Sequence, residues 1–561
     1  MREGKLDHAI EAFTTAVEIT PGLIDALHNL GITLWDKGDK DGALAAFARA
    51  IESDPNDAGS HFHFGSTLAN CDRLEDAEKP LARAVDLDPA MGKAFVLLGD
   101  VLRKMGDAAR SADMLAKAVA LEPDKAEIHR LLGSVLQDMG EMENALASYE
   151  KAYAIQPDNA EVSFSLASLL EMSNKLDQAS DVVREGLKAA PENFGLTLIA
   201  AKLQFRGGDH EAALAKLGAM TVDDDTPLEL RRDRCFEMGR VNDRLENEDA
   251  AYDCYAEGNA LSRRLWNPET SGKDLMLDYV EAHLKAVTED WISSWTPPFD
   301  GAEGKEGASP VFLIGFPRSG TTLLDQILDS HPGVQVLEEK PMVETVRESL
   351  ASKGDGYPET LATLSNQDIA EMRKLYFKIA EPFTASGDGG LLIDKLPLNT
   401  VEVALIHRLF PDAKFIFALR HPCDVCLSCF MQSFGDNTGM ANFLSLEDSV
   451  HLYERVMTLW RRYEVLMDMP IIRTRYEDLV DDFEGSVREL LEFLGLGWDD
   501  AVLDYRRHAA GRSINTPSYT QVTQKIYTRS RYRWRRYEKY FVPLIERLAP
   551  FIEEFGYADE T

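Results

Sequence analysis

A short stretch in the middle of the chain holds the side chains from which a chemistry can be inferred. An apolar run at 311–314 precedes a turn containing Gly315 and Gly320, and helical spacing of apolar residues begins at Thr321. A strand, a glycine-containing loop and a helix N-terminus bring backbone N–H groups and the positive end of a helix dipole to one anion. The pattern therefore predicts a phosphate-binding loop, the alternative being a strand–turn–helix whose glycines are incidental.

This loop lacks the lysine of an ATP-binding loop. The spacing from Gly315 to Gly320 fits the pattern G-x-x-x-x-G-K-[ST], but Thr321 stands in the lysine position, and Arg318 supplies the positive charge from inside the loop. Without a lysine to span the β- and γ-phosphates, the loop suits a nucleotide with a single 5′ phosphate-like group better than a nucleoside triphosphate with Mg²⁺. A P-loop kinase is kept as an alternative.

Two further cations follow predicted strands. Lys395 comes at the end of a strand near 390–394, and Arg420 follows a strand near 414–419. Ligands of parallel sheets bind at the carboxyl ends of strands. There a lysine can neutralise charge on a transferring group, and an arginine can grip a phosphate through paired hydrogen bonds. The alternatives are a surface lysine before a turn and an arginine paired with a neighbouring helix.

The elements that position these residues alternate between strands and helices. Further patterns predict a strand near 470–474 and helices near 399–410, 447–468 and 483–494. Residues 310–561 are therefore predicted to form a P-loop-like α/β domain with a central parallel sheet.

The first half of the chain repeats every 34 residues. Prolines recur at this interval from Pro21 to Pro191, with one row of small residues from Gly31 and one row of large residues from Phe13. This is the pattern of the tetratricopeptide repeat, a pair of antiparallel helices. We predict an all-α solenoid of about seven repeats over 1–265, the first one partial, whose groove binds a protein or peptide; self-association is the alternative.

Residues 266–309 are predicted to be a connecting helix and a linker rich in proline, glycine and charge. The net charge of −35 argues against general binding to nucleic acid or to an anionic membrane. No apolar run has the length of a membrane-spanning helix, and the N-terminus lacks the apolar core of a signal peptide. We therefore expect a cytoplasmic protein whose six cysteines are reduced.

Two other patterns have competing interpretations. Cys423, Cys426 and Cys429 are spaced along one helix face and are expected to pack as small apolar groups; an iron–sulfur site lacks a nearby fourth ligand, so no metal is predicted. Residues 525–539 carry seven basic side chains, one acid and four aromatic rings. They are predicted to form a lid over an anionic nucleotide, and binding of single-stranded nucleic acid is the alternative.

The motif Pro-Arg-Ser-Gly-Thr-Thr-Leu at 317–323 closely resembles the 5′-phosphosulfate loop of sulfotransferases that use PAPS (3′-phosphoadenosine 5′-phosphosulfate). The resemblance covers 310 to about 545 and is strongest with the tyrosylprotein sulfotransferase family. It implies that PAPS is the co-substrate and assigns several residues by position. The implied 5′-phosphosulfate loop is Pro317, Arg318, Ser319, Gly320, Thr321 and Thr322; Lys395 and Ser518 would stabilise the leaving group; and Arg420, Ser428, Tyr476 and Arg533 would bind the nucleotide.

The resemblance also implies a catalytic base. In that family the base is the second glutamate of a Gly-Glu-Glu that follows the phosphate loop and a His-Pro. Here His331 and Pro332 are followed by Leu-Glu-Glu, so Glu339 takes this role. His331 and His421 are alternatives, since small-molecule sulfotransferases use histidine.

This sequence departs from the family at four positions near the predicted site. Lys340-Pro341 replaces a Thr-Arg whose arginine helps to recognise the peptide, Gln432 replaces an arginine, and Arg533 replaces a lysine. The predicted function is transfer of the sulfuryl group of PAPS to an acceptor hydroxyl, on a protein tyrosine or another acceptor delivered by a partner. The alternative to an enzyme is a non-catalytic repeat scaffold with a relic nucleotide-binding domain.

Overall fold

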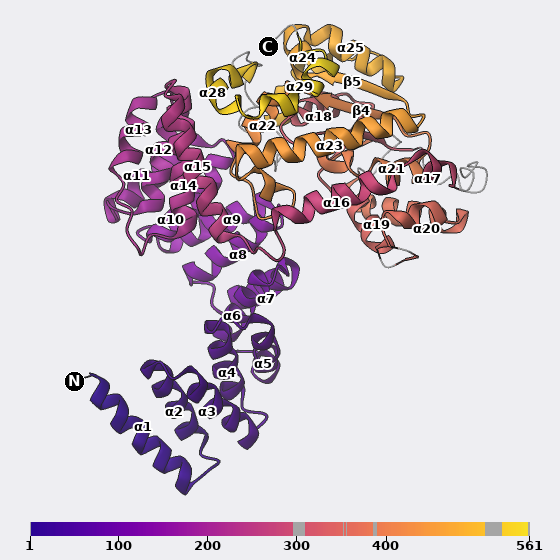
Figure 1. Ribbon diagram of the computed structural model, residues 1–561. Coiled ribbons are helices and arrows are strands. Elements are labelled where there is room, and N and C mark those ends of the chain that lie inside the picture. Colours follow the sequence, from indigo (N-terminus) through magenta and orange to yellow (C-terminus); the bar gives the residue numbers. More distant parts are fainter. Residues whose placement is uncertain are drawn as a thin grey trace. The chain divides into compact units, whose positions relative to one another are not determined.

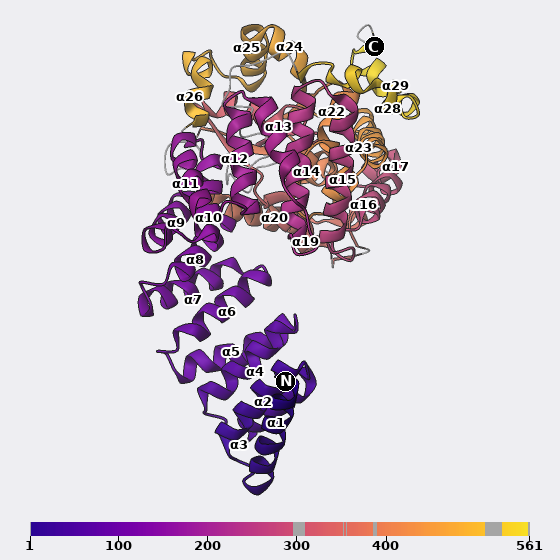
Figure 2. The ribbon, with the colours of Figure 1, turned by 90° about the vertical axis from the view of Figure 1, so that its left-hand side faces the viewer.

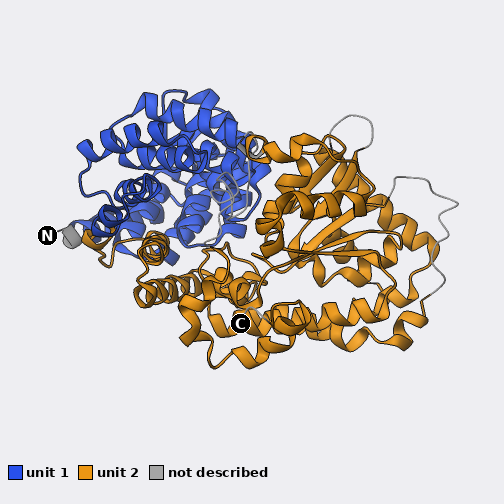
Figure 3. Cartoon of the chain, turned by 90° about the horizontal axis from the view of Figure 1, so that it is seen from above, with its two compact units in different colours: residues 1–216 blue, residues 217–561 orange. Residues whose placement is uncertain are grey.

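The computed structural model describes residues 2–295, 309–351, 353–354, 356–384, 390–510 and 530–558. Within these ranges no helix combines the length and the apolar character that crossing a membrane requires. Contacts divide the chain into two compact units, Met1–Lys216 and Leu217–Thr561, coloured separately in Figure 3.

The first unit is a series of antiparallel helix pairs (Figures 1 and 2). Its helices are α1 (Arg2–Ile19), α2 (Ile24–Lys37), α3 (Lys40–Ser53), α4 (Ala58–Asn70), α5 (Leu74–Leu87), α6 (Gly92–Lys104), α7 (Ala108–Leu121), α8 (Ala126–Asp138), α9 (Met142–Ile155), α10 (Ala160–Met172), α11 (Leu176–Ala189), α12 (Phe194–Arg206) and α13 (His210–Ala219). A Cβ atom added to Gly31 would lie 2.6 Å from the ring of Phe47, so the small residue of each pair admits the large one. The predicted solenoid is confirmed.

The second unit begins with helices that precede the sheet. They are α14 (Leu228–Arg244), α15 (Glu248–Leu265), α16 (Lys273–Ala286) and α17 (Glu289–Ser293). The pair α14–α15, predicted as the last repeat, therefore belongs by its contacts to the unit that contains the sheet. The predicted domain limits, 1–265, 266–309 and 310–561, stay a prediction. Most of the predicted linker, 296–308, lies outside the described residues.

The sheet has five parallel strands in the order β2-β3-β1-β4-β5. The strands are β1 (Val311–Gly315), β2 (Val334–Glu338), β3 (Leu391–Lys395), β4 (Phe415–Leu419) and β5 (Ile471–Arg475). Four of them were predicted, and β2 was not. The central strand β1 pairs with β3 and β4, so the loop after β1 lies between the ends of its two neighbours.

Helices cover both faces of the sheet, as predicted for a three-layer α/β domain (Figure 1). Alternate residues of β1 point to opposite faces: Val311 and Leu313 pack in one core, Phe312 and Ile314 in the other. The helices from β1 onward are α18 (Thr321–Asp329), α19 (Met342–Leu350), α20 (Asn366–Ala380), α21 (Val403–Leu409), α22 (Pro422–Phe430), α23 (Leu446–Leu466), α24 (Tyr476–Asp481), α25 (Phe483–Leu494), α26 (Tyr505–Ala510), α28 (Glu538–Phe541) and α29 (Ile545–Glu554), with short 3₁₀ turns η3 (Pro397–Thr400) and η7 (Arg533–Tyr537) among the connections.

Candidate active site

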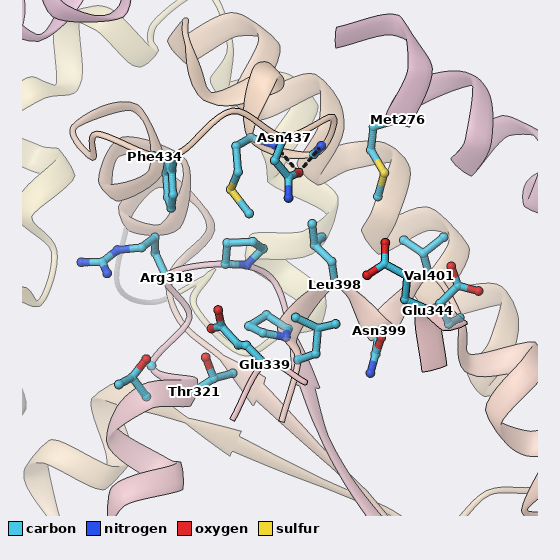
Figure 4. A pocket seen from close by; sticks show the side chains of 18 of the residues that line it. Met276, Arg318, Thr321, Glu339, Glu344, Leu398, Asn399, Val401, Phe434 and Asn437 are labelled. Atoms are coloured by element: carbon cyan, nitrogen blue, oxygen red, sulfur yellow. Dashed lines mark hydrogen bonds between the residues drawn. The ribbon is translucent and has the colours of Figure 1, made fainter. Parts of the chain in front are cut away.

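A cavity of about 460 Å³ opens where the strands of the sheet end, and Figure 4 shows part of its lining. Most of the predicted site residues lie in that lining. They are Pro317, Arg318, Gly320, Thr321, Thr322, Glu339, Arg420 and Tyr476. The structure thus brings together residues that are far apart in the sequence, at the edge of the sheet where α/β proteins bind their ligands.

The loop between β1 and α18 is held close to the neighbouring strands. The backbone N–H of Gly315 donates to Thr400 Oγ1 at 3.0 Å, and a Cβ at Gly315 would lie 2.7 Å from the carbonyl oxygen of Ala418. Gly320 caps α18 with a φ of 100°, a left-handed conformation that glycine adopts without strain. Both glycines are therefore needed for the shape of the loop, and the helix N-terminus faces the cavity.

Two residues of the lining hold unusual backbone conformations. Arg318 has a φ of 71° and Glu339 a φ of 50°, although neither is a glycine. Such conformations cost about 1–3 kcal/mol each and persist where the surrounding structure imposes them, most often at functional sites. Four other described residues that are not glycine, Asp72, Asn174, Glu246 and Tyr532, also have a positive φ and lie outside the lining, so the strain accords with the predicted roles of Arg318 and Glu339 without assigning them.

Arginine side chains from two loops converge beside α22. Arg318 Nε donates to Ser428 Oγ at 3.1 Å, and the guanidinium carbon of Arg420 lies 5.1 Å from the centroid of the Tyr476 ring. Arg420 also donates to the carbonyl oxygens of Arg318 and Ser530, at 3.4 and 2.5 Å. The predicted nucleotide-binding residues Arg420, Ser428 and Tyr476 therefore surround Arg318.

Lys395 lies at the centre of a buried cluster of carboxylates. Its Nζ atom is 3.0 Å from Oε1 of both Glu338 and Glu339 and 3.1 Å from Oδ2 of Asp325. Burial alone would lower the pKa of Lys395, but the charges of Asp325, Glu339 and Glu338 raise it above its ordinary value. Of the three carboxylates, only Glu339 lines the cavity, and its side chain is 41% exposed.

The pairing of β2 with β3 sets the position of Glu339. Glu338 stands opposite Lys395 in the register, and the N–H of Glu339 donates to the carbonyl oxygen of Lys395 at 2.8 Å. Sequence reasoning missed both this strand and the participation of Asp325. The signal for Asp325 was present, because a carboxylate on the apolar face of a helix, beside Leu324 and Leu328, needs a buried partner.

Four predicted residues that the structure describes are not found in the lining: Ser319, Lys395, Ser428 and Arg533. Arg533 pairs with Asp243 of α14, at 3.0 Å from Nε to Oδ1 and 2.7 Å from Nη2 to Oδ2, so the structure does not bring it to the cavity. Ser518 and the first part of the predicted basic lid lie outside the described residues. The nucleotide contact expected of Arg533 and the stabilisation of the leaving group expected of Lys395 and Ser518 stay predictions.

Neither alternative histidine lines the cavity. His331 bonds to the backbone, with its Nε2 3.0 Å from the carbonyl oxygen of Gly497. His421 is fully buried, and burial together with the nearby charges of Arg535, Arg420 and Arg475 lowers its pKa to about 3. This geometry favours Glu339 over both histidines as the base.

The three cysteines of α22 belong to the core. Cys423, Cys426 and Cys429 are fully buried, and burial raises the pKa of each thiol well above its ordinary range. Cys429 Sγ donates to the carbonyl oxygen of Pro317 at 3.3 Å, so α22 is hydrogen-bonded to the predicted phosphate-binding loop. Packing as small apolar groups is confirmed, and no group of metal-binding side chains occurs in the described part of the chain.

The sequence matches models of two known families. Residues 310–500 match the sulfotransferase family, and residues 28–91, 96–160 and 136–195 match tetratricopeptide repeats. The chain is 28% identical to protein-tyrosine sulfotransferase 2 of Gallus gallus over 35% of its own length and 53% of that protein. It is 25% identical to protein-tyrosine sulfotransferase A of Caenorhabditis elegans over 46% of its length and 69% of that protein.

An uncharacterized protein of Aquifex aeolicus is 28% identical over 57% of this chain and 42% of that protein. The chain thus spans about half the length of this protein and of the chicken enzyme. Among solved structures, MamA is 27% identical with a TM-score of 0.29, covering 30% of this chain and 92% of that chain. YrrB, a TPR protein with an unusual peptide-binding site, is 21% identical with a TM-score of 0.30, covering 33% and 96%. Residues 310–500 form a domain of the sulfotransferase family, and tetratricopeptide repeats precede it in the same chain.

Proposed function

We propose that the protein transfers the sulfuryl group of PAPS to an acceptor hydroxyl. The observation that carries this proposal is the convergence of Arg318, Arg420 and Glu339 on one cavity at the N-terminus of α18. Two cations and a helix N-terminus suit a nucleotide with phosphate groups at both ends, and a carboxylate between the loops suits removal of a proton from a hydroxyl.

The donors around the cavity fit such a nucleotide. Ser319 Oγ and Arg420 Nε are buried without a hydrogen-bond partner among the described residues, and an unpaired buried donor is costly. Phosphate oxygens would satisfy them. The backbone N–H groups of Thr321 and Thr322, with Arg318, would hold the 5′-phosphosulfate, and Arg420 with Ser428 would hold the 3′-phosphate.

The proposed reaction needs a base and a means of carrying charge on the leaving group. Glu339 accepts the proton of the acceptor hydroxyl, the hydroxyl oxygen forms a bond to sulfur, and the bond from sulfur to the 5′-phosphate oxygen breaks. Arg318 and the amides at the start of α18 stabilise the negative charge that develops on that phosphate. Lys395, with its Nζ 3.0 Å from Glu339 Oε1, holds this carboxylate in position at the cavity.

We further propose that the acceptor is a protein tyrosine or another hydroxyl delivered by a bound partner. Two observations support this: the curated relatives include protein-tyrosine sulfotransferases, and the chain carries repeats of a kind that commonly bind peptides.

Thermal stabilisation of the full chain tests the nucleotide. PAP, the product nucleotide, should raise the midpoint of unfolding more than ATP with Mg²⁺ does. The opposite order would support a P-loop kinase, and no response to PAP would support a non-catalytic scaffold. Incubation with labelled PAPS and host lysate then asks whether the label enters protein, lipid or glycan.

A further inference from the structure

The cavity continues past the phosphate loop into a second part, here called the acceptor end. It is lined by Met276, Glu344, Leu398, Asn399, Val401 and Met440. Figure 4 shows Arg318 on one side of the cavity, Glu344, Val401 and Met276 on the other, and Glu339 between them. A hydroxyl group beside Glu339 would therefore place the body of its molecule in the acceptor end.

The walls of the acceptor end are largely apolar. Met276, Leu398 and Met440 pack against the main core of the unit while also lining the cavity. Two amides also line this end. Asn437 already accepts from the N–H of Gly439 at 2.8 Å, whereas Nδ2 of Asn399, beside Val401, has no hydrogen-bond partner among the described residues and could serve one hydroxyl. Such walls suit an aromatic ring better than a sugar, whose further hydroxyls would lose their hydrogen bonds to water.

The charge at the acceptor end is dominated by carboxylates. Arg347, the arginine in its lining, is shared by three of them: its nitrogens lie 3.4 Å from Glu344, 3.7 Å from Glu348 and 3.8 Å from Glu402. Glu402 is nearly buried and accepts from the hydroxyls of Tyr279 and Tyr357. By contrast, the Glu344 side chain is 55% exposed. Glu344 is thus the carboxylate that an acceptor would meet.

The other cation in this part of the lining does not offset that charge. Lys340 replaces the Thr of the family's Thr-Arg, and its Nζ lies 4.7 Å from the ring centroid of Phe383, which is not part of the lining. The position of the family's arginine is Pro341. An acidic group on an acceptor would therefore meet Glu344 without a compensating cation from these two positions.

We propose that the acceptor end selects a phenol that carries a positive charge over one that carries a negative charge, and that Glu344 is the discriminating residue. This proposal rests on the proposed sulfotransferase function. An acceptor tyrosine would accordingly be flanked by basic or neutral groups.

Two small phenols test this without knowledge of the natural acceptor. Tyramine and 4-hydroxyphenylacetate have the same ring and opposite charges. Each is titrated by calorimetry into the full chain saturated with PAP. We expect tyramine to bind more tightly, and Glu344→Gln to reduce the ratio of the two dissociation constants about three- to tenfold, as for one charge near a protein surface. Glu344→Lys should reduce the ratio further.

Glu348→Gln is the matched control, because it removes the same charge from the same helix and the same arginine but does not line the cavity. It should keep the ratio of the unmodified protein. An unchanged ratio in Glu344→Gln, or no binding of either phenol to a protein that binds PAP, would overturn the inference and leave the proposed function standing. A protein that does not bind PAP would overturn both.

Discussion

Lys395 Nζ lies 3.0 Å from Glu339 Oε1, and the two groups differ sharply in their exposure. The lysine is fully buried, whereas the glutamate opens on the cavity. A fixed ammonium behind a carboxylate holds the carboxylate in one orientation, and a base that acts on a hydroxyl has to be held within hydrogen-bond reach of it. Glu338 and Asp325 complete the cluster from inside the protein and cannot reach a substrate in the same way.

Replacing Glu339 with glutamine should abolish turnover while leaving PAP affinity nearly unchanged. The amide keeps the size of the side chain but cannot accept the proton, and loss of a general base costs about 10²–10⁴-fold in rate. Sulfuryl transfer and the PAP dissociation constant are measured on the same preparation. Glu338→Gln is the control, since Glu338 has the same lysine partner but is only 11% exposed and does not line the cavity. Lost PAP binding in Glu339→Gln would refute the assignment.

Replacing Lys395 with methionine should destabilise the protein by about 3–5 kcal/mol, because it leaves buried carboxylates without their cation. Burial already raises the pKa of Asp325 to about 7 even beside the ammonium. Adding Asp325→Asn to Lys395→Met should therefore restore part of the lost stability, measured by chemical unfolding. Strictly additive losses in the two variants would show that the ion pair is not the cause.

Replacing Arg420 with alanine should weaken PAP binding about 10- to 100-fold, as for loss of a charged hydrogen bond. The binding of AMP, which lacks the 3′-phosphate, should change far less. The ratio of the two dissociation constants therefore reports the phosphate that Arg420 contacts. Arg473→Ala is the control, because Arg473 pairs with Glu464 at 2.8 Å and is absent from the lining. Equal losses for PAP and AMP would rule out the 3′-phosphate role.

Local patterns were enough to predict most of the fold. The 34-residue period specifies helix pairs because each small residue faces a large one, as Gly31 faces Phe47. Buried parallel strands such as β4 read as unbroken apolar runs. Strand β2 was missed because Gln335 and Glu338, the two residues of the strand that are only partly buried, interrupt its apolar run. Pairing with β3, a tertiary feature, makes it a strand.

The candidate site likewise contains residues that could be placed from the sequence and one contact that could not. Arg318, Thr321 and Arg420 lie next to predicted strands, so their meeting follows from sheet topology. The contact between Arg533 and Asp243 joins residues 290 positions apart, on a 3₁₀ turn and on a helix of the predicted last repeat. No periodicity or spacing in the sequence specifies such a pair. The sequence of a basic segment also does not show whether its side chains contact a ligand or a neighbouring helix.

Replacing Asp243 with alanine should destabilise the second unit by about 2–3 kcal/mol. Asp243 accepts from Arg533 and also from the hydroxyl of Tyr537 at 2.8 Å, and loss of one partner leaves the other poorly solvated. The expected loss of stability is smaller than for a fully buried ion pair because the Arg533 side chain is 24% exposed. Chemical unfolding measures it, with Asp233→Ala as a control on the same helix.

The same two positions also test whether Arg533 contacts the nucleotide. Arg533→Gln should cost less stability than Asp243→Ala, which also removes the acceptor of the Tyr537 hydroxyl, and the double variant should cost little more than Asp243→Ala alone, since both remove the pair of Arg533 with Asp243. With the guanidinium held by Asp243, PAP affinity should hardly change in either variant. A large loss of PAP affinity in Arg533→Gln alone would instead place Arg533 at the nucleotide.

The buried imidazole of His421 should make stability fall with acid. Its pKa is about 3 in the folded protein, mainly because of burial, against an ordinary value near 6.5. Between these values the unfolded chain binds a proton that the folded chain does not. The contribution of His421 to the free energy of unfolding should therefore decrease as pH falls from about 6.5, by about 1.4 kcal/mol per pH unit.

Other groups oppose this trend, so the effect of His421 has to be isolated by difference. Burial raises the pKa of Asp394 to about 7, so the folded protein holds a proton there that the unfolded chain releases, and the stability from that proton is lost as pH rises toward 7. Comparing the unmodified protein with His421→Asn at each pH cancels this term. The stability advantage of the unmodified protein should shrink steadily from pH 6.5 to pH 4. His421→Asn also loses packing against Trp534, whose ring centroid is 5.1 Å from that of His421, but this loss changes the difference in free energy of unfolding by the same amount at every pH. A difference that does not vary with pH would show that the fold does not keep the imidazole neutral.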